Sequence, residues 1–99
     1  FIRKDSGVWE HTAWTLLQKK PNAVEIDWKA STNPGDPNGF IKLYLNDNLK
    51  VKKLKINNDT HTINSVRLGI TQNLAPTSNI SGHFYLDAFA SDATTHIGP

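Results

Sequence analysis

Hydrophobic and polar residues alternate with a period of two in several segments of this chain. In residues 24–29 apolar side chains alternate with charged ones, and residues 40–45, 65–70 and 83–89 also alternate. Successive side chains of a strand point to opposite faces, so each segment predicts a strand with one face toward a core. The predicted interior positions are Val24, Ile26, Trp28, Ile41, Leu43, Leu45, Val66, Leu68, Phe84 and Leu86.

Turn-forming residues separate these segments. Residues 31–39 are dense in Pro, Gly, Asn and Asp, residues 46–48 have the length of a hairpin turn, and residues 57–59 and 76–82 are further loops. No window keeps helical spacing for long, and no internal repeat is present. The spacing therefore predicts an all-β fold, an antiparallel β-sandwich, with residues 1–99 forming a single domain or the C-terminal part of one.

Composition narrows the range of partners. The 99 residues include no cysteine and carry a net charge of +2, so neither a disulfide framework nor a thiolate metal site is available. The basic cluster is Lys50, Lys52, Lys53 and Lys55, which we interpret as a solvated edge strand, because lysines discourage edge-to-edge pairing. A nucleic-acid surface would need a wider basic field, so we expect no nucleic-acid partner. No apolar run is long enough to span a membrane.

The succession of motifs resembles a bacterial family of concanavalin-A-like (LamG-like) jelly-roll domains found in secreted and surface proteins. The resemblance covers nearly the whole chain in order. It rests on Trp-Thr-Leu-Leu at 14–17, Val-Glu-Ile-Asp-Trp-Lys-Ala at 24–30, Pro-Gly-Asp-Pro-Asn-Gly at 34–39, Ile-Lys-Leu-Tyr-Leu-Asn-Asp at 41–47, Asn-Asp-Thr at 58–60, Val-Arg-Leu-Gly at 66–69, Phe-Tyr-Leu-Asp-Ala-Phe at 84–89 and Ile-Gly-Pro at 97–99. The lysine stretch and the Asn-rich residues 72–81 depart from the family pattern and put a transferred ligand preference in doubt.

The resemblance implies a jelly-roll fold and an extracellular or cell-surface location. Family members are longer, so it also implies that strands preceding Phe1 belong to the same domain and that this chain is an incomplete one. Similar domains often hold a structural Ca²⁺ with an aspartate near the last strand, which points to Asp87 as a metal ligand. The alternative is that Asp87 pairs with Arg67 or with a lysine.

The strongest enzymatic candidate is the pair Glu25 and Asp27, which period-two spacing places on one face of a strand. Glycosidases with this architecture place alternating carboxylates on such a strand as acid and nucleophile. Here Lys29 occupies the position of the further carboxylate that those enzymes need. A lysine beside Asp27 favours the ionised carboxylate, which opposes the role of a general acid. We therefore expect a salt-bridged strand surface and no enzymatic activity.

Aromatic side chains suggest a binding surface instead. Phe40 and Tyr44 share the wetter side of their predicted strand with Lys42 between them. Aromatic faces flanked by polar groups suit sugar rings, which they contact through apolar stacking and hydrogen bonds. These three residues are the predicted ligand-binding site. The alternative is that the rings are buried aromatics of the sheet.

These patterns predict a non-catalytic extracellular β-sandwich module for adhesion, glycan contact or structural packing, with a polysaccharide as the expected ligand. One alternative is a structural subunit that assembles with copies of itself or with other chains. Another is the accessory part of a carbohydrate-active enzyme whose catalytic residues lie upstream. A sheet with an uncovered apolar face would need strands from elsewhere, supplied by an upstream segment or by neighbouring subunits.

Overall fold

The computed structural model describes residues 1–63, 65–66, 83 and 85–92 and confirms the all-β prediction. Within these residues the chain forms two antiparallel sheets and no helix, consistent with a β-sandwich-like fold. The described part contains no helix long and apolar enough to cross a membrane. The strands are β1 (Ile2–Arg3), β2 (Trp9–Glu10), β3 (Val24–Lys29), β4 (Gly39–Leu45) and β5 (Asn48–Ile56).

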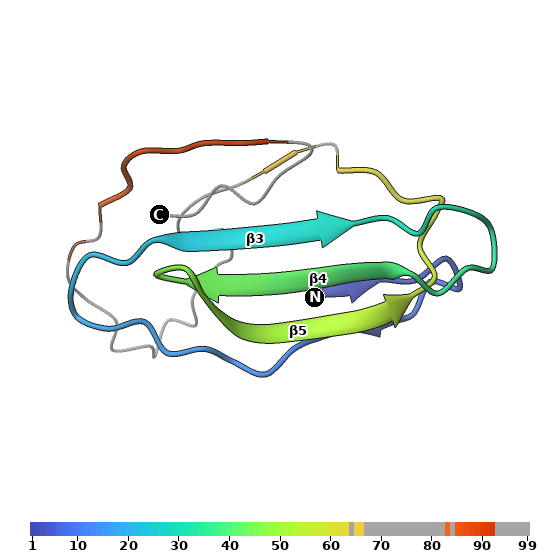
Figure 1. Ribbon diagram of the computed structural model, residues 1–99, viewed down its shortest axis with the longest axis horizontal. Helices are drawn as coiled ribbons and strands as arrows, with labels where there is room; N and C mark the ends of the chain where they lie inside the picture. Colours follow the sequence, from blue (N-terminus) through green and yellow to red (C-terminus); the bar gives the residue numbers. More distant parts are fainter. Residues whose placement is uncertain (64, 67–82, 84, 93–99) are drawn as a thin grey trace, which may run out of the picture.

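The larger sheet has three strands in the order β3-β4-β5 (Figure 1). A two-residue turn joins β4 to β5, because Leu45 pairs with Asn48 and leaves Asn46 and Asp47 between them. Both turn residues have positive φ, 51° and 66°. A type I′ turn requires this backbone, and its twist matches that of the flanking strands. Asn and Asp tolerate positive φ better than other non-glycine residues, so the hairpin prediction is confirmed.

The lysine segment forms β5, which is an edge strand in the described part of the chain, as predicted. Its pairing with β4 shifts register between Leu43 and Tyr44 and again between Gly39 and Ile41. At the second shift Lys55 has φ 59°, which bends the strand. Such irregularities increase local twist. Together with the lysines, they disfavour pairing of this edge with the same edge of another copy.

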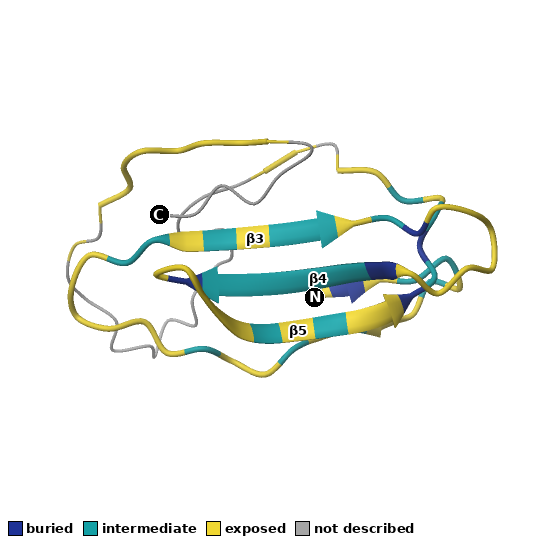
Figure 2. Cartoon of the chain, in the orientation of Figure 1, coloured by how far each residue is buried: buried dark blue, intermediate teal, exposed yellow. Residues whose placement is uncertain are grey.

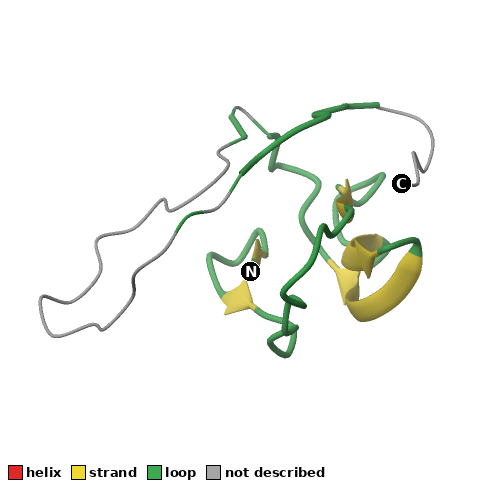
Figure 3. Cartoon of the chain, turned by 90° about the vertical axis from the view of Figure 1, so that its left-hand side faces the viewer, coloured by secondary structure: helices red, strands yellow, loops and turns green. Residues whose placement is uncertain are grey.

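The smaller sheet, β1–β2, lies behind the β4–β5 part of the larger sheet (Figure 1), and the perpendicular view also separates the two (Figure 3). A backbone hydrogen bond of 2.9 Å from Asp5 N to Asn57 O links the turn after β1 to the end of β5. Glu10 of β2 also forms an ion pair with Lys53 of β5, 3.0 Å between Oε2 and Nζ. These contacts hold the small sheet over one end of the large one.

Burial is concentrated at the ends of the strands (Figure 2). The buried apolar side chains among the described residues are Ile2, Leu45 and Ile56. The prediction of an interior position is correct for Leu45 but wrong for Val24 and Ile26, which are 53% and 65% exposed. Both lie on edge strand β3, and β1–β2 covers the β4–β5 side instead. Trp28, Ile41 and Leu43 are half-buried.

The predicted C-terminal strands find no support in the described residues. Val66 and Leu86, predicted to be interior, are 64% and 59% exposed, and residues 65–66 and 85–92 form no strand. Ala88 has φ 53°, which interrupts the extended backbone that alternation at 83–89 predicted. The predicted interior positions Leu68 and Phe84 lie outside the described residues.

Candidate functional site

The cross-strand register decides which side chains share a face of the larger sheet. Directly paired residues point the same way, so the partners of Phe40, Lys42 and Tyr44 join them on one side. We call this side the front face; its members are Glu25, Asp27, Lys29, Phe40, Lys42, Tyr44, Leu49 and Lys52. The opposite side, the back face, carries Val24, Ile26, Trp28, Ile41, Leu43, Leu45, Val51 and Lys53.

The front face points away from the small sheet. Lys53 belongs to the back face and forms its ion pair with Glu10 of β2, so β1–β2 lies on the back side. In Figure 1 no described segment crosses in front of β3, β4 and β5. Within the described part of the chain, the front face is therefore the side of the larger sheet that the small sheet does not cover.

The structure brings the three predicted ligand-binding residues together on the central strand. Phe40, Lys42 and Tyr44 are all half-buried, as are Ile41 and Leu43 on the other side of β4. The predicted contrast between a wetter and a drier side of this strand is therefore absent. The Cα atoms of Phe40 and Tyr44 are about 13 Å apart, at a rise of about 3.3 Å per residue.

The two aromatic rings differ in their surroundings. Lys42 Nζ lies over the Phe40 ring, 4.2 Å from its centroid, in a cation–π contact that orients the lysine and covers part of the ring. Tyr44 pairs across the sheet with Glu25 on one side and with Leu49 on the other. The Tyr44 ring thus has a carboxylate beside it and an apolar neighbour opposite, the combination that suits a sugar ring.

Acidic residues on β3 complete this surface. Glu25 is opposite Tyr44, and Asp27 is opposite Lys42. Both carboxylates are half-buried, and their oxygens are hydrogen-bond acceptors. Sequence reasoning treated this pair only as a candidate acid and nucleophile. Its role beside Tyr44 depends on the register between β3 and β4, which alternation within one strand cannot reveal.

Basic residues lie on the other side of the central strand. Lys42 pairs with Lys52 of β5, while Lys50 and Lys55 of the same strand are exposed. On β3 the carboxylates of Glu25 and Asp27 are followed by Lys29, whereas the charged residues of β5 are all lysines. On the front face itself, β5 contributes Leu49 and Lys52.

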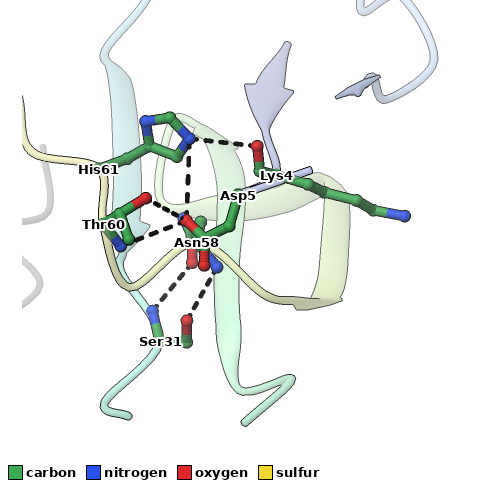
Figure 4. Close-up of polar contacts among 6 residues, drawn as sticks. All are labelled: Lys4, Asp5, Ser31, Asn58, Thr60 and His61. Atoms are coloured by element: carbon green, nitrogen blue, oxygen red, sulfur yellow. Dashed lines mark hydrogen bonds and ion pairs between the residues drawn. The ribbon is translucent and has the colours of Figure 1, made fainter. Parts of the chain in front are cut away.

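A second polar cluster lies where the small sheet meets the large one (Figure 4). Ser31 N donates to Asn58 Oδ1 and Asn58 N donates to Ser31 Oγ, both at 2.8 Å. These residues are 5% and 0% exposed, so the reciprocal pair satisfies polar groups that water does not reach. The Asn58 Nδ2 atom is buried without a hydrogen-bond partner. The pair fastens the loop after β3 to the segment after β5.

The same cluster joins Asp5 to the segment after β5. Asp5 Oδ1 accepts hydrogen bonds from Thr60 Oγ1 and from Thr60 N, the latter at 3.2 Å. The Thr60 hydroxyl is the main cause that lowers the pKa of Asp5, while a hydrogen bond shared with Asp5 raises the pKa of Asp59. His61 Nε2 donates to the Lys4 carbonyl oxygen at 3.1 Å and lies 3.8 Å from Asp5 Oδ1.

This arrangement does not activate a nucleophile. A hydroxyl nucleophile needs a base that takes its proton and a third group that orients the base. Here the Thr60 hydroxyl donates a hydrogen bond to Asp5, whose lowered pKa makes it a weak base, and His61 donates a hydrogen bond to a backbone carbonyl. The geometry is that of a structural junction between two sheets.

A shallow hollow of about 130 Å³ near the N-terminus is lined by Phe1, His11, Thr12, Ala13 and Trp14. The Phe1 and His11 rings form a tilted contact, with 5.6 Å between their centroids. Trp14 lines the hollow but is 95% exposed, so other side chains pack little against it. This geometry offers an apolar rim but no group arranged for chemistry.

The residues near Asp87 do not assemble a calcium site within the described part of the chain. Asp87 is exposed, and its Oδ1 accepts a 2.7 Å hydrogen bond from Ala88 N. No group of three or more acidic, histidine or cysteine side chains suited to a metal occurs among the described residues. Ca²⁺ takes six to eight oxygen ligands, and Asp87 supplies few of them here. Calcium binding at Asp87 therefore stays a prediction, and its alternative partner Arg67 lies outside the described residues.

Comparison with known proteins adds no relative: no family model, no curated protein and no solved structure matches this chain. The resemblance to concanavalin-A-like domains remains a prediction from the motifs.

Proposed function

We propose that this chain is a non-catalytic β-sandwich module of the jelly-roll, concanavalin-A/LamG-like type that contacts a polysaccharide outside the cell. The observation that carries the proposal is the front face, where Tyr44 has Glu25 beside it in the register of β3 and β4. A pyranose ring has an apolar face that stacks on an aromatic ring and hydroxyls that donate to carboxylates at its edge. The pairing of Tyr44 with Glu25 offers both contacts to the same ring.

The neighbouring residues extend this surface along β4. Asp27 and Lys42 form the next cross-strand pair, and Lys29 and Phe40 the one after it. A saccharide chain lying along β4 would meet an aromatic ring at each end and polar groups between them. The span of about 13 Å from Tyr44 to Phe40 suits an oligosaccharide better than a single sugar.

The absence of catalysis is part of the proposal. Glu25 and Asp27 lie opposite Tyr44 and Lys42, and Lys29 follows them along β3. Lys29 takes the position of the further carboxylate that glycosidases of this architecture carry along such a strand. Turnover of a β-glucan or galactan that disappears in Glu25→Gln would contradict this part of the proposal.

The test is binding to an array of β-glucan and galactan oligosaccharides, followed by calorimetric titration of each saccharide retained. Tyr44→Ala should weaken binding about fivefold, since a stacking aromatic contributes about 1 kcal/mol beyond its contact area. Tyr85→Ala is the matched control, because Tyr85 is 90% exposed and lies outside the sheets. Equal affinity of Tyr44→Ala and wild type would exclude the front face. An array without any retained saccharide would exclude these glycans and favour the structural-subunit alternative.

A further inference from the structure

Asparagine followed by glycine occurs once in this sequence, at Asn38 and Gly39, where the loop after β3 enters β4. Glycine has no Cβ, so its backbone nitrogen can approach the side chain of the preceding residue more readily than the nitrogen of a residue with a side chain. Asn38 is exposed, as are residues 32–37 of the same loop (Figure 2), so water reaches the Asn38 amide. An asparagine in this setting can react with the glycine nitrogen that follows it.

The folded loop holds the Asn38 amide at both of its polar atoms. Thr32 N donates to Asn38 Oδ1 at 2.9 Å, and Asn38 Nδ2 donates to Thr32 Oγ1 at 2.8 Å. A hydrogen bond of 2.9 Å from Asn38 N to the Asp36 carbonyl oxygen holds the backbone. A five-membered ring that joins Asn38 Cγ to Gly39 N keeps χ1 away from its staggered values. Asn38 must therefore turn out of this hydrogen-bonded position before the ring can close.

Gly39 is restrained as well. It is the first residue of β4, is buried, and pairs with Ile56 of β5. A Cβ at Gly39 would overlap Asn58 Oδ1 and lie 2.8 Å from the Ile56 carbonyl oxygen, so this backbone has little room to move. Ring closure at Gly39 N thus requires a local opening at the start of β4.

We propose that Asn38 is a modification site that deamidates spontaneously, and that Thr32 slows this reaction in the folded chain by holding the Asn38 side chain. Gly39 N bonds to Asn38 Cγ, the bond from Cγ to Nδ2 breaks, and ammonia leaves with the proton that Gly39 N gives up. Water then opens the resulting succinimide, at Cγ to form aspartate or at the backbone carbonyl carbon to form isoaspartate. The inference is independent of glycan binding, because it concerns the loop between β3 and β4.

The two products differ in what they do to the fold. Aspartate keeps the backbone unchanged, and its carboxylate can accept hydrogen bonds from the backbone N–H and the hydroxyl of Thr32. Isoaspartate carries the chain through Cβ, which adds a backbone carbon directly before Gly39. The close contacts of Gly39 with Ile56 and Asn58 leave no space for that shift. We therefore expect the isoaspartate form to unfold at a lower urea concentration than wild type.

The experiment incubates the full chain at mildly alkaline pH, which favours loss of the Gly39 amide proton, and follows Asn38 by peptide mapping with mass spectrometry. The chain unfolded in urea should deamidate at Asn38 at least about tenfold faster than the folded chain, since the folded chain must first open. Thr32→Val removes the hydroxyl that accepts from Asn38 Nδ2 and keeps the backbone N–H. Folded Thr32→Val should react about fivefold faster than folded wild type, because one hydrogen bond is lost.

Thr12→Val is the matched control. The Thr12 hydroxyl donates to the Ala13 carbonyl oxygen, outside the loop between β3 and β4, so this variant should deamidate at the wild-type rate. Circular dichroism verifies that both variants keep their strands. The proposal is overturned if Asn38 keeps its amide in the unfolded chain, if folded wild type reacts as fast as the unfolded chain, or if folded Thr32→Val reacts at the wild-type rate.

Discussion

The junction between the two sheets and strand β3 differ sharply in how far their side chains are buried. The junction, where β1–β2 meets the end of β5, contains buried Ile2 and Ile56 together with the fully buried Asn58. The outer side of β3 exposes Val24 and Ile26 instead. The junction combines apolar burial with hydrogen bonds and ion pairs, whereas in the described part of the chain the strand paired with β3 is β4 alone. We infer that the junction supplies much of the stability.

The largest expected effect comes from filling space at the junction. A Cβ at Gly39 would overlap Asn58 Oδ1 and lie 2.8 Å from the Ile56 carbonyl oxygen, so backbone would have to move. Gly39→Ala should therefore lower the free energy of unfolding by about 3 kcal/mol, as overpacking does in rigid surroundings. Urea denaturation with an unchanged m-value measures this loss.

Gly35→Ala is the matched control in the loop between β3 and β4. Nothing lies within 4 Å of a Cβ at Gly35, but its φ is +82°. The substitution should cost about 1 kcal/mol, the cost of a left-handed conformation for a residue with a Cβ. Equal losses in the two variants would mean that close packing at Gly39 does not distinguish the junction from the loop.

An intermediate effect follows from the ion pairs of Glu10. Hydrogen bonds from Lys4 and then Lys53 lower the pKa of Glu10 from 4.5 to about 2. A carboxyl whose folded-state pKa is depressed contributes stability above its unfolded pKa, and that contribution is lost as pH falls toward the folded value. Glu10→Gln should therefore lower the Tm at pH 6, and the difference from wild type should shrink between pH 4.5 and pH 2.

An NMR titration of the Glu10 carboxyl resonance checks the cause directly. Lys53→Gln should move the midpoint upward toward the ordinary glutamate value, because it removes one of the two cations. Added salt should reduce the shift, since these groups are partly exposed. An unshifted Glu10 would mean that β2 is not held to β5 by this carboxylate.

Local alternation predicted much of the larger sheet correctly. It placed strands at residues 24–29 and 40–45, while the lysine cluster indicated the edge strand and residues 46–48 indicated a hairpin, whose turn is Asn46 and Asp47. It also placed Phe40, Lys42 and Tyr44 on one face, because side-chain direction within a strand follows from position alone. These features depend on neighbours in the sequence.

Burial and register were not predictable in this way. Alternation gives Val24 and Ile26 a shared face, but their exposure depends on which distant segment covers that face. The position of Glu25 beside Tyr44 depends on pairing across the loop of residues 30–38, whose length does not set the register. Likewise, β1 and β2 are two residues each, too short for a periodic signal. Long-range contacts decide each of these features.

The smallest expected effect belongs to the open side of β3. Ile26 is 65% exposed, so Ile26→Thr removes little buried apolar area and retains a β-branched side chain suited to a strand. Unfolding free energy should change by less than about 0.5 kcal/mol when measured by urea denaturation at a concentration where sedimentation shows monomer. The same substitution at Ile56, which is 1% exposed, should cost about 3 kcal/mol, because it removes buried apolar contacts and leaves a hydroxyl in their place. A loss of 2 kcal/mol or more for monomeric Ile26→Thr would mean that a segment of the same chain covers β3 in solution, and the contrast between the junction and the open edge would then be wrong.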